Sequence, residues 1–251
     1  MNIQVSGLLK PSSSFIEETE KYEYSKADMI LPIIVWLISF VFVWLLCVYN
    51  KQIALTFNDS SVFIKILVSF AFPVTIIGLV FLVSRFRGQK IIISSFTNRF
   101  ALRSLMVGLV FGSIHIVIII VLRSLTQDYV ITFISDMGFI RVLWTVAYHL
   151  VGVAFMEELL YRRFMAPRFL GFFRSKTIAV ILGGFLFSLL HVPQDMFTFE
   201  IGFLQAVVNR ALHDIIIHGA FLWLYAKYNN LLGPVLWHFI VNYMQLLLVM
   251  R

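Results

Sequence analysis

Two adjacent glutamates, Glu157 and Glu158, interrupt an apolar stretch of the chain, VLWTVAYHLVGVAFMEELLYRRF. Ionisable side chains are rare in membrane-buried segments, where they usually face a bundle interior or a wet cavity. Arg162 follows Glu158 by four residues, so these two side chains share a helix face and can pair. Glu157 lies about 100° around the helix and cannot share that arginine equally well. The spacing therefore predicts one neutralised carboxylate and one available as a base, although both could instead mark the membrane interface.

Two further pairs of residues are also spaced by four. FSLLH places Phe187 and His191 on one helix face, and HFIVN places His238 and Asn242 on another. An imidazole and a carboxamide on one face can donate two hydrogen bonds to a single oxygen, as a developing oxyanion requires. Each pair taken singly also fits a structural role, as a satisfied histidine or as polar contacts between helices.

A third polar series, Arg210, Asp214 and His218, recurs at every fourth position. This spacing predicts a ladder of side chains that satisfy one another on one helix face, with substrate contact as the weaker alternative.

Together these residue types predict amide hydrolysis by activated water. A carboxylate can take a proton from water, and an imidazole can hold that water or protonate a leaving amine. The remaining imidazole and carboxamide can bind the oxyanion. No serine, cysteine or aspartate constellation competes as a nucleophile, and the sequence contains no phosphate loop or HExxH motif. The expected substrate is a peptide or a membrane protein.

Membrane helices must position these residues, because the composition excludes an ordinary soluble domain. Of the 251 residues, 60% are hydrophobic and only 13% are charged. Apolar stretches long enough to cross a bilayer recur along the chain. The sequence therefore predicts an all-α polytopic bundle in the lipid bilayer, with a polar cytoplasmic tail over residues 1–28 and one transmembrane domain over residues 29–251.

Seven membrane segments are predicted, at residues 29–49, 61–84, 105–122, 142–165, 177–192, 201–226 and 234–250. Arginines and lysines collect after the second and fourth segments, which places both loops in the cytoplasm. We thus expect a multi-pass protein of the cell membrane with a cytoplasmic amino terminus. The net charge of +7 belongs to these loops rather than to a nucleic-acid surface. The single cysteine, Cys47, excludes an intramolecular disulfide.

The three motifs, in their order along the chain, resemble those of a known family. EELLYR (157–162) fits EExxxR, FSLLH (187–191) fits FxxxH and HFIVN (238–242) fits HxxxN. The sequence resembles the CPBP intramembrane proteases, which comprise the type II CAAX prenyl endopeptidases and the bacteriocin-processing or bacteriocin-immunity (Abi) proteins. The resemblance covers roughly residues 142–245.

The resemblance implies a role for each matching residue. Glu157 would be the general base that activates water together with His191, and His238 and Asn242 would bind the oxyanion. Supporting roles fall to Glu158, Arg162 and Phe187. The family is regarded as glutamic, without a cofactor, although Glu157, His191 and His238 could ligate zinc as an alternative.

The resemblance allows several substrates: prenylated CAAX tails, peptide pheromones or bacteriocin precursors, reaching the cavity from the membrane or the cytoplasmic face. A non-catalytic immunity protein or sensor-kinase partner of the same fold is the main alternative. A transporter is a third, against which stands the absence of an inverted repeat in the sequence.

If Glu157 and His191 act on one water, their side chains must lie close together. At 1.5 Å per residue, His191 lies about 21 Å along its helix from Thr177, whereas Glu157 is only about 9 Å from Arg163. We therefore expect the fourth helix to continue towards Phe173, bending at Pro167, and to bring the two side chains within about 8 Å, the reach of a bridging water.

Overall fold

The fold is given by a computed structural model, which describes residues 10–20, 25–49, 53, 62–89, 96, 99–126 and 139–247. These residues form helices and no strand, which confirms the predicted all-α bundle. The first helices are α1 (Ser13–Glu20), α2 (Lys26–Val48), α4 (Val62–Phe86) and α5 (Ala101–Thr126).

The fourth predicted segment is part of one long helix over residues 139–172. Its successive parts are α6 (Phe139–Ala147), a π-helical stretch (Tyr148–Phe155), α7 (Met156–Glu158), a second π-helical stretch (Leu159–Met165) and α8 (Ala166–Phe172). The helix thus continues to the residue before Phe173, as predicted. π-Helical turns are rare and frequent at functional sites. Here they flank the two glutamates on both sides.

The chain ends with α9 (Lys176–Phe199), α10 (Phe203–Tyr228) and α11 (Leu232–Leu247). The predicted fifth segment, 177–192, was too short, because α9 runs through Pro193 to Phe199. Proline removes one backbone hydrogen bond, yet membrane helices tolerate it where neighbours satisfy the freed group.

Helices occupy all seven predicted segments. Five of them, within the described residues, are long and apolar enough to cross a membrane: 26–48, 64–86, 101–122, 139–172 and 176–199. α10 and α11 are helices at the remaining two places. The protein is accordingly a multi-pass membrane bundle.

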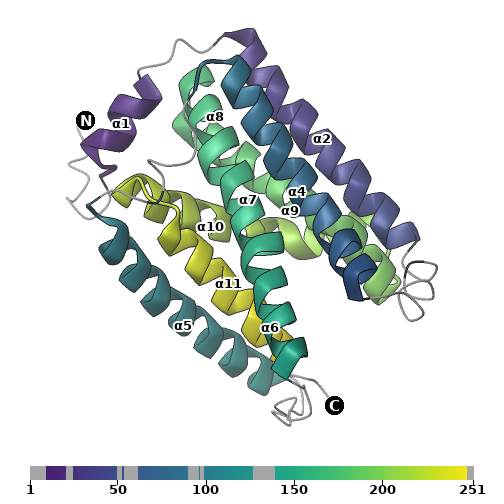
Figure 1. Ribbon diagram of the computed structural model, residues 1–251. Helices are drawn as coiled ribbons and strands as arrows, with labels where there is room; N and C mark the ends of the chain where they lie inside the picture. The colour runs from purple at the N-terminus through teal and green to yellow at the C-terminus, as the bar shows by residue number, and fades with distance from the viewer. Residues whose placement is uncertain are drawn as a thin grey trace.

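Several helices that are distant in the sequence pack against one another (Figure 1). α5 and α11 lie side by side, and α2 runs next to α4 and α9. α10 packs along α9, where a Cβ on Gly183 would lie 2.8 Å from Nε2 of His218 and a Cβ on Gly184 would lie 2.8 Å from Cα of Ile215. These two glycines therefore allow α9 and α10 to approach each other closely.

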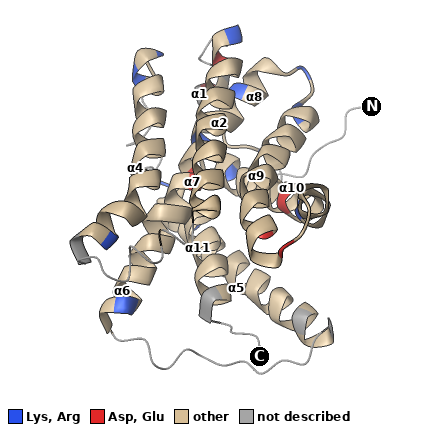
Figure 2. Ribbon diagram, turned by 90° about the vertical axis from the view of Figure 1, so that its right-hand side faces the viewer, with Lys and Arg blue, Asp and Glu red and all other residues tan. Residues whose placement is uncertain are grey.

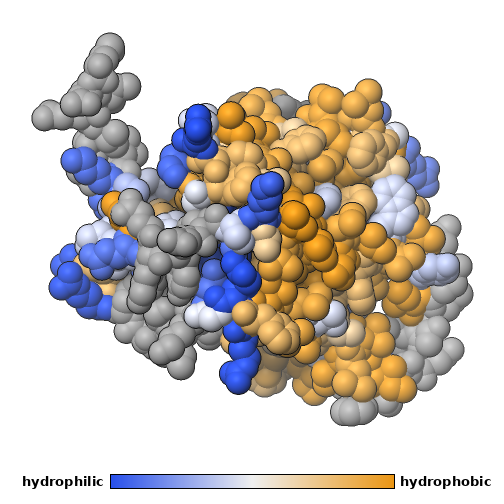
Figure 3. All heavy atoms as spheres, turned by 90° about the horizontal axis from the view of Figure 1, so that it is seen from above, coloured by the Kyte–Doolittle hydropathy of each residue, from blue (hydrophilic) through white to orange (hydrophobic). Residues whose placement is uncertain are grey.

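One end of the bundle, called here the basic end, collects most of the described arginines and lysines (Figure 2). Hydrophilic side chains gather there beside an apolar surface in the view from above (Figure 3). Nη2 of Arg87 lies 2.6 Å from Oδ2 of the buried Asp28, and Arg87 Nε donates to Oδ1 at 3.1 Å. These bonds to Asp28 raise the pKa of the Arg87 guanidinium. This end includes Lys26 at the start of α2, Arg85 in the last turn of α4 and Arg87 just after it, Arg168 beside Asp28, Arg174 just before α9 and Lys176 at its start.

The tail before α2 is partly folded against this end. Phe15 of α1 is buried, and its ring meets that of Tyr225 edge-on, with centroids 5.5 Å apart. The Ser12 backbone N–H donates to the Ala226 carbonyl at 2.9 Å. The amino-terminal segment is therefore attached to the end of α10.

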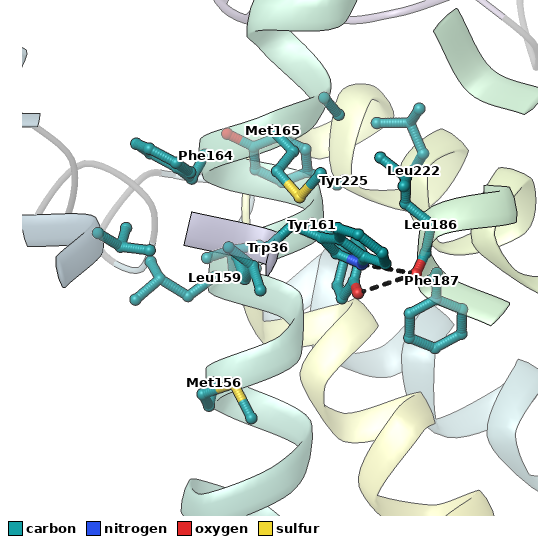
Figure 4. Packing of buried hydrophobic residues seen from close by; sticks show 14 of the residues in the cluster. Trp36, Met156, Leu159, Tyr161, Phe164, Met165, Leu186, Phe187, Leu222 and Tyr225 are labelled. Carbon is teal, nitrogen blue, oxygen red and sulfur yellow. Dashed lines mark hydrogen bonds between the residues drawn. The ribbon is translucent and has the colours of Figure 1, made fainter. Parts of the chain in front are cut away.

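A cluster of large buried side chains, called here the aromatic core, includes Trp36, Tyr161, Phe164 and Phe169 (Figure 4). Nε1 of Trp36 donates to the Leu186 carbonyl at 2.8 Å, and the Tyr161 hydroxyl donates to the same oxygen at 3.3 Å. Phe164 and Phe169 beside them have no exposed surface. These contacts join α2, the long helix and α9.

Candidate active site

Glu158 pairs with Arg162, as their spacing predicted. Arg162 Nε lies 3.1 Å from Glu158 Oε2, and both side chains are fully buried. The guanidinium carbon also lies 4.8 Å from the ring centroid of Phe187 and 4.9 Å from that of Phe221. Such cation–π contacts stabilise a desolvated guanidinium. Phe187 of the second motif therefore helps to hold the arginine that holds Glu158.

The second oxygen of Glu158 connects the long helix to α11. Oε1 lies 2.8 Å from Nδ1 of His238, whose ring is buried. A carboxylate only accepts hydrogen bonds, so Nδ1 carries the proton and donates it. The ring stacks on Phe221 at a centroid distance of 5.4 Å. Glu158 thus fixes the orientation of His238, a contact that the sequence did not predict.

Glu157 lies between two imidazoles. Its Oε2 is 3.7 Å from Nε2 of His191 and 3.8 Å from Nε2 of His238. The predicted proximity of Glu157 and His191 is confirmed. Both distances exceed a hydrogen bond, but a water beside the pair could lie about 2.8 Å from both Glu157 and an imidazole. Within the described chain, the buried Oε2 has no hydrogen-bond partner.

The tautomer of His191 follows from its other ring nitrogen. Nδ1 lies 2.9 Å from the Phe187 carbonyl oxygen, which can only accept. Nδ1 therefore carries the proton, and the neutral ring presents the lone pair of Nε2 towards Glu157. A water held there would donate one hydrogen to Glu157 and one to His191.

A cavity of about 930 Å³ adjoins these residues. Glu157, His191 and Asn242 line it, together with residues of α2, α4, α10 and the first π-helical stretch. Asn242 lies one helical turn beyond His238 and is half-buried. The carboxylate, one imidazole and the carboxamide therefore face one space, and Nε2 of His238 lies 3.8 Å from the same Glu157 oxygen.

The predicted ladder of Arg210, Asp214 and His218 is present only in its first step, and Arg210 has a closer partner on α9. Nη2 of Arg210 donates to Oδ1 of Asp195 at 2.7 Å, and its Nε also donates to Asp195. Asp214 is more distant, with Oδ2 3.9 Å from Nη1 of Arg210, and accepts from Nδ1 of His213 at 2.9 Å. His218 is buried against α9 instead. Sequence reasoning missed Asp195.

The donors that zinc would use are Oε2 of Glu157 and the Nε2 atoms of His191 and His238. In the part of the chain that the structure describes, no group of three His, Cys, Asp or Glu side chains is arranged to hold a metal ion.

The carboxyl-terminal part of the chain matches a known family. The family described as type II CAAX prenyl endopeptidase Rce1-like matches residues 139–244. The match starts at the first residue of α6 and ends inside α11, so that it includes all three motifs. It confirms the resemblance found in the motifs. Comparisons with curated proteins and with solved structures gave no match.

Proposed function

We propose that this protein, whose residues 139–244 match the Rce1-like type II CAAX prenyl endopeptidases, is an intramembrane endopeptidase in which Glu157 activates water. The observation that carries the proposal is the position of Glu157. Its Oε2 is buried without a hydrogen-bond partner in the described chain, and two imidazole nitrogens lie 3.7 and 3.8 Å away. An unpaired buried oxygen is costly. A water molecule that bonds to Glu157 and His191 removes that cost.

In the proposed reaction, this water attacks the carbonyl carbon of the scissile peptide bond. Glu157 takes one proton from the water as its oxygen bonds to carbon, and Nε2 of His191 accepts a hydrogen bond from the other hydrogen. The carboxylic acid formed at Glu157 then gives its proton to the leaving nitrogen as the C–N bond breaks. The products are a carboxylic acid and an amine, and Glu157 returns to its starting state.

The tetrahedral intermediate carries a negative oxygen that needs donors. His238, whose Nδ1 donates to Glu158, can supply one from Nε2 when that nitrogen also carries a hydrogen. Arg162 holds that carboxylate in place. The side-chain amide of Asn242, in the cavity wall, supplies a second donor.

The supporting roles proposed for Glu158 and Arg162 have a physical explanation. Glu158 acts on His238 through a hydrogen bond, and is therefore a positioning residue rather than a second base. Arg162 acts one step further away, through Glu158. The two neighbouring glutamates thus have different tasks although they are adjacent in sequence.

Glu157→Gln tests the proposal, because glutamine keeps the shape of the side chain and removes its basicity. Wild type, Glu157→Gln and a deletion strain would be compared by mass spectrometry of peptides from cells with matched membrane levels of protein. We expect a cleavage product that is lost in both the variant and the deletion. Its sequence would distinguish a CAAX tail from a pheromone or bacteriocin precursor.

The opposite outcome has a definite meaning. If deletion produces a phenotype that Glu157→Gln restores in full, the protein acts by binding, as an immunity protein or a sensor partner would.

A further inference from the structure

The residues that line the cavity are buried at one end of it and exposed at the other. Met156, Glu157 and Leu190 line it and are buried, whereas Gln194 and Thr198, also in its wall, are exposed. Leu190 and Thr198 both belong to α9, two turns apart. The cavity therefore opens along α9 towards the carboxyl end of that helix.

On α9, the catalytic His191 is nearer to this open end than to the start of the helix at the basic end. α9 begins at Lys176, at the basic end, and His191 follows after 15 residues, or about 22 Å of helix. Only eight residues, or about 12 Å, separate His191 from Phe199 at the other end.

At the end of the cavity opposite its opening, the aromatic core closes the path from Glu157 to the basic end. Tyr161, which follows Glu157 by one helical turn, and Phe164 beyond it have no exposed surface. Trp36 and Tyr161 both bond to the Leu186 carbonyl, which fixes this packing across three helices (Figure 4). A peptide could not pass here without breaking these contacts.

The wall near the open end is polar enough to hold water and peptide. Gln194, Thr198 and Gln245 contribute side chains that can donate and accept hydrogen bonds, and the Arg210 side chain is 30% exposed beside Asp195. Most of the bundle surface around them is apolar. This part of the wall offers hydrogen bonds to the backbone of an extended segment and a path for the water that the reaction consumes.

The distribution of charge orients the bundle in the membrane. Basic residues accumulate on the cytoplasmic side of membrane proteins, so the basic end belongs in the cytoplasm. The opening of the cavity then faces the outer half of the bilayer.

We propose that the substrate enters from the non-cytoplasmic face and that its scissile bond lies in the outer half of the membrane. The inference rests on the proposed function for the hydrolysis itself. It specifies the substrate class as a peptide, or a membrane-anchored segment, that is presented on the outer face. A prenylated tail at the cytoplasmic face would meet the aromatic core instead.

Thiol labelling in cells tests the direction of access without requiring proteolysis. In a Cys47→Ser background, Val153→Cys places a thiol in the cavity wall near Glu157, and Thr177→Cys places one on the exposed start of α9. Ala154→Cys, next to Val153 but fully buried, is the matched control. A membrane-impermeant maleimide would be added at mildly alkaline pH, where the thiolate reacts, to intact and to permeabilised cells.

We expect Val153→Cys to be labelled equally in intact and permeabilised cells, Thr177→Cys only after permeabilisation, and Ala154→Cys in neither. Labelling of Val153→Cys only after permeabilisation would overturn the inference, because the cavity would then open to the cytoplasm. So would labelling of Thr177→Cys in intact cells, which would reverse the orientation, and so would a Val153→Cys thiol that never reacts. Each of these results leaves the Glu157→Gln test of hydrolysis unaffected.

Discussion

Adjacent glutamates with different partners should respond differently to the same substitution. Glu158 forms an ion pair with Arg162 and a hydrogen bond with His238, and its replacement by glutamine removes the charge that both partners face. Glu157 Oε2 has no hydrogen-bond partner within the described chain. We therefore expect Glu158→Gln to lower stability and activity together, and Glu157→Gln to lower activity alone.

The magnitudes follow from burial. Arg162 and Glu158 are both fully buried, and removing one partner of such a pair costs about 3–5 kcal/mol, because the other charge remains without compensation. Glu157→Gln relieves a buried charge without breaking a hydrogen bond at Oε2, so stability should stay the same or rise by up to about 1 kcal/mol. Loss of a general base should reduce the rate about 10²- to 10⁴-fold.

A double variant separates the two functions of Glu158. Glu158→Gln combined with Arg162→Met removes both buried charges, and this should recover most of the lost stability. It should not recover activity, since His238 still lacks its carboxylate partner. Unfolding of the purified proteins in detergent micelles, followed by a thermal shift, ranks the variants. Formation of the product identified by mass spectrometry gives their activity.

Two results would refute this division of roles. One is a Glu158→Gln protein as stable as the wild type, which would mean that Arg162 does not need the pair. The other is a Glu157→Gln protein as destabilised as Glu158→Gln, which would make both residues structural.

Two further predictions concern packing, and both can be measured by the same thermal unfolding. Gly184→Ala would place a Cβ 2.8 Å from Cα of Ile215 and force α9 and α10 apart, at a cost of about 1–3 kcal/mol. The control Gly78→Ala, with nothing within 4 Å of the new Cβ, should not destabilise the protein. Equal effects of the two substitutions would contradict the close approach of the two helices. Trp36→Phe removes one hydrogen bond to the Leu186 carbonyl and should cost about 0.5–1.5 kcal/mol with activity retained; loss of activity at unchanged stability would contradict a purely structural role.

Contacts within one helix could be predicted from residue spacing, whereas spacing alone does not give the contacts between helices; the proximity of Glu157 and His191 was expected from the family resemblance. The spacing of Glu158 and Arg162 fixes a shared face, because helix geometry is local. Which neighbour that face meets depends on how far each helix extends and how it is rotated. The bond from His238 to Glu158 joins positions 80 residues apart, and no spacing encodes it.

The missed residue Asp195 shows how an error in a helix boundary becomes an error in the site. The expected end of the helix at 192 excluded Asp195, since proline usually marks a helix boundary. α9 continues past Pro193, so Asp195, four residues after His191, is on the same face as that histidine. The spacing was a usable signal. Arg210 pairs with Asp195 across helices, in preference to Asp214 within its own helix, which the local pattern could not decide.

The closed inner end of the cavity determines the order in which the products can leave. Because the aromatic core lies beyond Glu157, a polypeptide cannot be threaded past the carboxylate and must enter as a chain end or a bent loop. Under the proposed function, both fragments then leave by the route through which the substrate came. The fragment bound deeper can depart only after the outer one, so the deeper fragment should act as a competitive inhibitor and its release should limit turnover on long substrates.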